Sequence, residues 1–82
     1  AIGAACREAA GWPESVRVAV NVPVSLFLAE DFVACVADAV TTTGLAPARL
    51  ELEISEAVFL GDASLVDRTL AALFKLGVRL TL

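Results

Sequence analysis

The chain has 82 residues, a net charge of −4 and no histidine, and 59% of its residues are hydrophobic. Its six Lys and Arg residues are spread along the sequence, which excludes a nucleic-acid polymer as partner. No run of about 18 apolar residues is present, which argues against direct membrane insertion. We expect a cytoplasmic location, which leaves open that other domains of a longer parent protein attach it to a membrane. Cys6 and Cys35 lie in helix-like patterns and are interpreted as two buried free thiols.

The first half of the chain predicts a helix, a strand and a second helix. Residues 1–10 are rich in alanine and favour a helix that Gly11 can end. Residues 16–22, VRVAVNV, alternate between aliphatic and other residues, which is typical of a strand. From Ser25 onward, apolar residues recur at helical spacing, and this predicts one long helix that ends at Gly44.

The second half predicts a strand, a helix and a third strand. Residues 49–55, RLELEIS, alternate strictly, and the final VRLTL does so again. Between them, Asp62 or Ser64 is a plausible N-cap and Gly77 a plausible end of a helix. Its predicted apolar side consists of Val66, Leu70, Leu73 and Phe74.

The predicted order is therefore α-β-α-β-α-β, which is typical of parallel strands joined by right-handed crossovers. No linker or low-complexity stretch interrupts it, so residues 1–82 are predicted to lie in one domain without an internal boundary. The apolar content is high for so short a chain, because a small fold leaves much of its surface exposed. We therefore expect either self-association over an apolar surface or a piece of a larger domain, and favour the piece.

Each predicted strand has one aliphatic face and one face with polar groups. Helices on both sides of an open sheet would call for strands that are apolar on both faces. A sheet covered by helices on one side, and curved so that the other side becomes a polar lumen, fits better. We therefore predict an α/β fold that is part of a TIM-like (β/α) barrel of three βα-type units, with its site at the carboxyl ends of the strands.

Asn21 and Glu53 occupy the carboxyl end of their strands on the polar face. Amide and carboxylate oxygens suit the hard cations Mg²⁺, Mn²⁺ and Ca²⁺, so this pair is a candidate metal site. Glu51 lies deeper, and we expect it to form an interior ion pair with Arg17 or Arg79, because an unpaired buried carboxylate is costly. The residues alone leave open that this face meets solvent in a two-layer α/β fold.

Three segments resemble the middle of the EAL domain of bacterial cyclic di-GMP phosphodiesterases. These are VAVNVPVSLFLAEDFVACV, GLAPARLELEISEAVFLGD and LAALFKLGVRLTL, and together with Trp12 they span essentially the whole chain. ELEISE is a close variant of the family's Glu-Leu/Ile-Thr/Ser-Glu signature, and VNV matches its asparagine strand. The two motifs are specific in this order and spacing, whereas either one alone would be weak.

The resemblance implies a TIM-like barrel that hydrolyses cyclic di-GMP to linear pGpG with Mg²⁺ or Mn²⁺. It implies that Asn21 and Glu53 are metal ligands and that Glu56 anchors a loop from a later strand beside the metals. The alternative is that Glu56 is a solvated loop carboxylate. Two divalent ions can activate water and stabilise phosphate charge, so the chemistry requires no histidine.

The sequence departs from the family pattern just after the asparagine. The family usually has Ser two residues later, and often Arg and Gln soon after; here Pro23, Ser25 and Leu26 stand in that segment. The Glu-Ala-Leu strand is expected before residue 1, and the Asp-Asp-Phe-Gly segment and a catalytic lysine after Leu82. We therefore expect the 82 residues alone to be inactive, and to self-associate or exchange elements through open strand edges.

Two other functions remain open at this point. The domain could be a catalytically degenerate EAL-like receptor for cyclic di-GMP or a protein-interaction module, which the altered segment after Asn21 favours. It could also be a small α/β protein without a ligand. Intact Asn21, Glu53 and Glu56 favour the enzyme.

Overall fold

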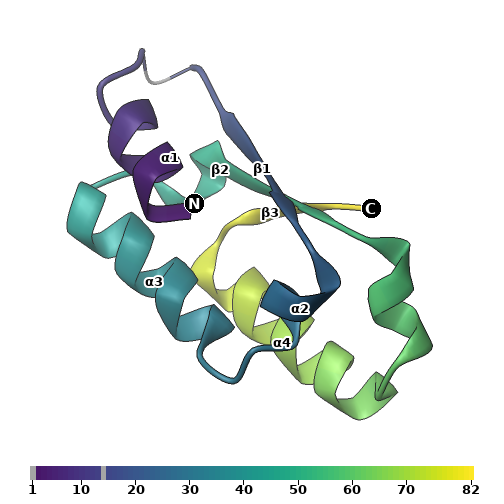
Figure 1. Cartoon of the computed structure of the whole chain (residues 1–82). Coiled ribbons are helices and arrows are strands. Elements are labelled where there is room, and N and C mark those ends of the chain that lie inside the picture. Colours follow the sequence, from purple (N-terminus) through teal and green to yellow (C-terminus); the bar gives the residue numbers. More distant parts are fainter. Residues whose placement is uncertain (1, 14) are drawn as a thin grey trace.

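A computed structural model describes residues 2–13 and 15–82 of the chain. Helices and strands alternate, and a short 3-10 helix lies on either side of the middle strand (Figure 1). No described helix is long and apolar enough to cross a membrane. In chain order the elements are α1 (Ile2–Ala9), β1 (Val18–Val22), α2 (Val24–Phe27), α3 (Phe32–Thr43), η1 (Pro47–Arg49), β2 (Leu50–Ile54), η2 (Glu56–Leu60), α4 (Ala63–Leu76) and β3 (Arg79–Thr81).

The three strands form one parallel sheet in the order β1-β2-β3, which confirms the predicted α/β fold. Helices α1, α3 and α4 lie on one side of this sheet, and the figure shows no helix on the other side (Figure 1). The register pairs Val20 with Leu52, and Leu52 with Leu80, across the three strands. Aliphatic side chains therefore line up in rows on the face that the helices cover.

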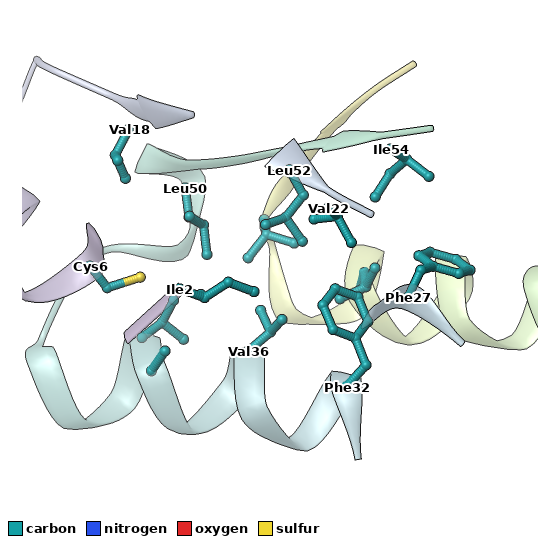
Figure 2. Packing of buried hydrophobic residues seen from close by; sticks show 14 of the residues in the cluster. Ile2, Cys6, Val18, Val22, Phe27, Phe32, Val36, Leu50, Leu52 and Ile54 are labelled. Atoms are coloured by element: carbon teal, nitrogen blue, oxygen red, sulfur yellow. The ribbon is translucent and has the colours of Figure 1, made fainter. Parts of the chain in front are cut away.

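The hydrophobic core fills the space between this face and the helices (Figure 2). Leu50 and Leu52 point from β2 toward α3, and neither has any exposed surface. Among the described residues, no polar or charged residue is buried. Burying apolar surface is the main force that holds such a layer together, at roughly 25 cal/mol per Å². The helix-covered face therefore serves stability.

The long helix expected between Ser25 and Gly44 is divided into α2 and α3, with a break at residues 28–31. Phe27 and Phe32 explain the break. On one continuous helix, side chains five residues apart point about 140° away from each other, so only one of them could face the core. In the structure both rings are buried and their centroids lie 5.7 Å apart.

Helix α4 begins and ends where the sequence predicts. The Asp62 carboxylate accepts hydrogen bonds from the backbone N–H groups of Ser64 and Leu65, and Gly77 ends the helix with a positive φ of 88°. Phe74 belongs to the predicted apolar side of this helix, but its side chain is 66% exposed. It lies about 100° around the helix from the buried Leu73, at the edge of the apolar stripe.

The amino-terminal end of the sheet is closed by Arg49. Its guanidinium donates hydrogen bonds to the carbonyl oxygens of Ala9 and Val16, each at 2.9 Å, and of Pro13 at 3.1 Å, with a longer contact of 3.5 Å to Trp12. The planar guanidinium can serve several acceptors at once because its five N–H groups form a rigid fork. Arg49 thus ties the segment between α1 and β1 to the start of β2.

Candidate metal site at the carboxyl edge of the sheet

A cleft of about 550 Å³ lies at the opposite, carboxyl end of the strands. Each of the three strands contributes residues to this cleft, together with the residue that directly follows the strand. The lining residues are Asn21, Val22, Pro23, Glu53, Ile54, Ser55, Thr81 and Leu82. This is the edge where open and closed parallel α/β sheets generally place their ligands, because the loops that follow the strands can be varied without disturbing the core.

Asn21, Glu53 and Thr81 form one row across the floor of the cleft. Glu53 is the register partner of Asn21 on one side and of Thr81 on the other, so the three side chains share the uncovered face. All three are exposed. Because neighbouring strands lie about 4.8 Å apart, an amide oxygen and a carboxylate on adjacent strands can reach the same small ion.

This donor set fits part of a site for a hard divalent cation. Asn21 and Glu53 supply oxygen atoms, which Mg²⁺ and Mn²⁺ prefer over nitrogen or sulfur. Such ions take about six ligands, and the described residues contain no group of three or more His, Cys, Asp or Glu side chains that could hold a metal. The two residues therefore amount to a partial coordination set.

Glu51 makes a different contact from the one expected. Its carboxylate is half-buried and accepts a hydrogen bond of 2.9 Å from the Thr81 hydroxyl. Arg79 pairs with Glu51 in register, but its guanidinium turns to the carbonyl oxygen of Ala48, to which it donates at 3.2 Å. Arg17 lies just before β1 and is exposed. Glu51 thus contacts a hydroxyl rather than either arginine.

Thr81 is the residue of this site that sequence reasoning did not single out. The alternation in VRLTL placed it on the polar face, but nothing in the sequence distinguished it from an ordinary exposed threonine. Its importance depends on the register between β2 and β3, which sets it beside Glu53 and within reach of Glu51.

Glu56 directly follows Ser55, which lines the cleft, and it occupies the first position of η2. Its side chain is exposed. The turn there is held by Ser55, whose hydroxyl oxygen accepts a hydrogen bond of 3.3 Å from the N–H of Ala57. A loop-anchoring role for Glu56 needs a partner loop beyond the residues described, so that role stays a prediction.

Only one of the three residues that depart from the family pattern lies in the cleft. Pro23 lines it and precedes α2 with an extended backbone. Leu26 instead packs against the core and faces a second groove between α1 and α3. Ser25 is exposed and does not line the cleft. The departure at the cleft is thus confined to Pro23.

The two cysteines are free, as expected, but only one is buried. Cys6 lies in the core, and burial raises the pKa of its thiol. Cys35 is exposed, which corrects the expectation of two buried thiols. Desolvation together with the carboxylates of Asp31 and Asp38 raises the pKa of the Cys35 thiol, so neither cysteine resembles a reactive thiolate.

The chain is similar to curated bacterial proteins and to solved structures. It is 37% identical over 78 residues to an uncharacterized signaling protein of Caulobacter vibrioides, and 39% identical over 74 residues to the uncharacterized protein y4lL of Sinorhizobium fredii. It matches the structure of the PaMucR phosphodiesterase in complex with c-di-GMP with a TM-score of 0.90 and 29% identity. No family profile matches the chain.

These matches cover nearly all of this chain but only part of each relative. They include 95% and 90% of the chain against the curated proteins, and 96% against the solved structure. In return the chain spans 10% and 9% of the curated relatives and 35% of the solved phosphodiesterase. The structural match thereby confirms the resemblance to part of an EAL phosphodiesterase domain.

Proposed function

We propose that this chain lies in the middle of an EAL domain and supplies part of a barrel that hydrolyses cyclic di-GMP to linear pGpG, which its match to part of a phosphodiesterase structure supports. The observation that carries the proposal is the in-register pair of Asn21 and Glu53 in a cleft at the carboxyl edge of the sheet. The related structure is a phosphodiesterase in complex with c-di-GMP, which supports cyclic di-GMP as the substrate class.

In this proposal Asn21 and Glu53 hold Mg²⁺ or Mn²⁺ through one amide and one carboxylate oxygen. When bound, such ions activate a water molecule and neutralise charge on the phosphate oxygens. The remaining ligands come from the other strands of the barrel, because two side chains do not complete a coordination shell. Glu56 follows the same strand as Glu53 and anchors a neighbouring loop at the mouth of the cleft.

The chain's own contribution is positioning. Both proposed ligands sit on strands whose opposite face is packed into the core, where Val22 and Ile54 are buried next to them in sequence. A side chain on a packed strand is held more firmly than one on a loop. The two oxygen donors are therefore prearranged, and little ordering is needed when the ion binds.

A second candidate function is that of a receptor that binds cyclic di-GMP without hydrolysing it. Pro23 favours it, because this residue lines the cleft where the family usually presents a serine hydroxyl. Proline has neither a side-chain hydroxyl nor a backbone N–H, so the cleft lacks two possible donors to a phosphate at this point.

The test is hydrolysis of cyclic di-GMP in the presence of Mn²⁺ by the protein that carries this chain. We compare Glu53→Gln with Glu30→Gln, a matched change of an exposed glutamate that does not line the cleft. Loss of a group that stabilises the transition state typically lowers turnover about a hundredfold or more, and we expect this for Glu53→Gln alone. Saturable binding without turnover would identify a receptor. If the protein neither binds nor hydrolyses cyclic di-GMP, both proposed functions are contradicted.

A further inference from the structure

The polar face of the sheet contains a hydrogen-bonded pair of side chains that has no role in the proposed function. The Thr81 hydroxyl donates to the Glu51 carboxylate at 2.9 Å. Among the described residues this is the one side-chain-to-side-chain hydrogen bond that joins two strands. The other two link residues four positions apart within or next to α3.

The register shows where this pair lies relative to the proposed ligands. Glu51 stands opposite Arg79, one side-chain level below the row that contains Glu53 and Thr81. Its hydrogen bond nevertheless goes to Thr81 rather than across to Arg79, so its carboxylate leans toward the carboxyl edge of the sheet. Thr81 itself lines the cleft together with Asn21 and Glu53. The pair thus joins the floor of the cleft to the layer beneath it.

The hydrogen bond determines what Thr81 can offer to a ligand. A threonine hydroxyl has one hydrogen to donate and two lone pairs that accept, whereas a carboxylate only accepts. Because the Thr81 hydrogen is committed to Glu51, the oxygen of Thr81 presents lone pairs to the cleft. Beside Glu53, this makes the floor a group of acceptors, suited to a cation or to the donating hydrogens of water bound to one.

We propose that Thr81 is a positioning residue that accepts a hydrogen bond from a water molecule of the divalent cation held at Asn21 and Glu53. Glu51 acts through Thr81 by fixing the direction of its hydroxyl. The proposal rests on the proposed function, since it requires a cation at that pair. Hydrogen bonds to the groups that coordinate a metal ion tune the affinity for the ion. Removing such a hydrogen bond typically weakens metal binding about 10-fold to 100-fold.

The test is direct binding of Mn²⁺, measured by the paramagnetic resonance signal of the free ion, in the protein that carries this chain. Thr81→Val replaces the hydroxyl by a methyl group of similar size, and Thr81→Ser restores the hydroxyl. We expect the valine variant to bind Mn²⁺ about 10-fold more weakly and the serine variant to bind nearly as the parent does. Equal thermal unfolding of the two variants excludes a general loss of folding.

The role of Glu51 is tested by a double-mutant cycle. Glu51→Met removes the acceptor at similar length, while Glu51→Gln keeps an oxygen acceptor and removes the charge. If Glu51 acts through Thr81, Glu51→Met weakens Mn²⁺ binding less in the Thr81→Val background than in the parent. Additive effects in the cycle would overturn this part of the inference.

The outcomes separate this inference from the proposed function. If the parent binds Mn²⁺ in a manner that depends on Glu53, and Thr81→Val binds it equally tightly, only the role of Thr81 is overturned. If the parent binds no Mn²⁺, or if Glu53→Gln leaves its binding unchanged, the cation site itself is wrong and the role of Thr81 fails with it.

Discussion

The two faces of the sheet are built from the same three strands but differ in almost every physical property. On the helix-covered face, Leu50 and Leu52 have no exposed surface and lie in the core (Figure 2). On the other face, Asn21, Glu53 and Thr81 are exposed and line a cleft. Adjacent residues such as Leu52 and Glu53 therefore have separate tasks. Because side chains alternate along a strand, one short segment can supply stability on one side and chemistry on the other.

The largest effect on stability is expected from the helix-covered face. Leu52→Ala removes a fully buried side chain from the centre of the middle strand. Substitutions of this type cost about 2–5 kcal/mol, since they lose burial and leave a cavity. Urea denaturation of the protein that carries the chain measures this change.

Glu53→Ala, one residue further along the same strand, is the matched control for Leu52→Ala. Its side chain is exposed, so we expect a change in unfolding free energy within about 0.5 kcal/mol, together with loss of metal-dependent activity. A similar loss of unfolding free energy in both variants would show that the polar face contributes to stability as much as the helix-covered face does.

A smaller effect is expected at the amino-terminal end of the sheet, where Arg49 binds backbone carbonyls. Arg49→Met keeps an apolar side chain of similar length and removes the donors. Hydrogen bonds from a charged donor contribute about 1.5–3 kcal/mol when they are shielded from water. Since Arg49 is only half-buried, we expect Arg49→Met to lower the free energy of unfolding by about 1–2 kcal/mol in total.

Two measurements make the Arg49 prediction specific. Backbone amides between α1 and β1 should exchange their hydrogens faster in Arg49→Met, because the segment loses its attachment to β2. Arg49→Lys should restore only part of the stability, because an ammonium group cannot reach several carbonyls in one plane. Full restoration by lysine would show that charge alone, and not the fork geometry, holds the segment.

The smallest effect is expected at the start of α4. Asp62 accepts hydrogen bonds from two backbone N–H groups there, and Asp62→Ala should cost about 1 kcal/mol of unfolding free energy. Asp67→Ala, an exposed change within the same helix, is the control and should have little effect. Equal effects of the two changes would argue against capping. Neither residue lines the cleft, so neither should change turnover.

The alternation of residues made the sheet predictable. Period-two patterns in RLELEIS and VRLTL placed the strands and sorted their faces, and glycine marked the ends of α3 and α4, where Gly44 and Gly77 have positive φ. The same reasoning put Asn21 and Glu53 at one edge, since parallel strands end together. Local signals were sufficient because each depends on only a few neighbouring residues.

Features that depend on contacts between distant segments were not predictable. The break between α2 and α3 follows from packing Phe27 against Phe32, and the exposure of Phe74 follows from which side of α4 meets the sheet. The Thr81–Glu51 hydrogen bond joins residues on different strands and depends on their register. None of these leaves a periodic trace in the sequence.

The central claim is that Asn21 and Glu53 hold a divalent cation, and anomalous scattering from Mn²⁺ tests it most directly. Crystals of the protein that carries this chain would be soaked in Mn²⁺ and measured near the manganese absorption edge. The account predicts an anomalous peak within about 2.5 Å of both the Asn21 amide oxygen and a Glu53 carboxylate oxygen. A fully occupied peak elsewhere, with none beside these two residues, would contradict it.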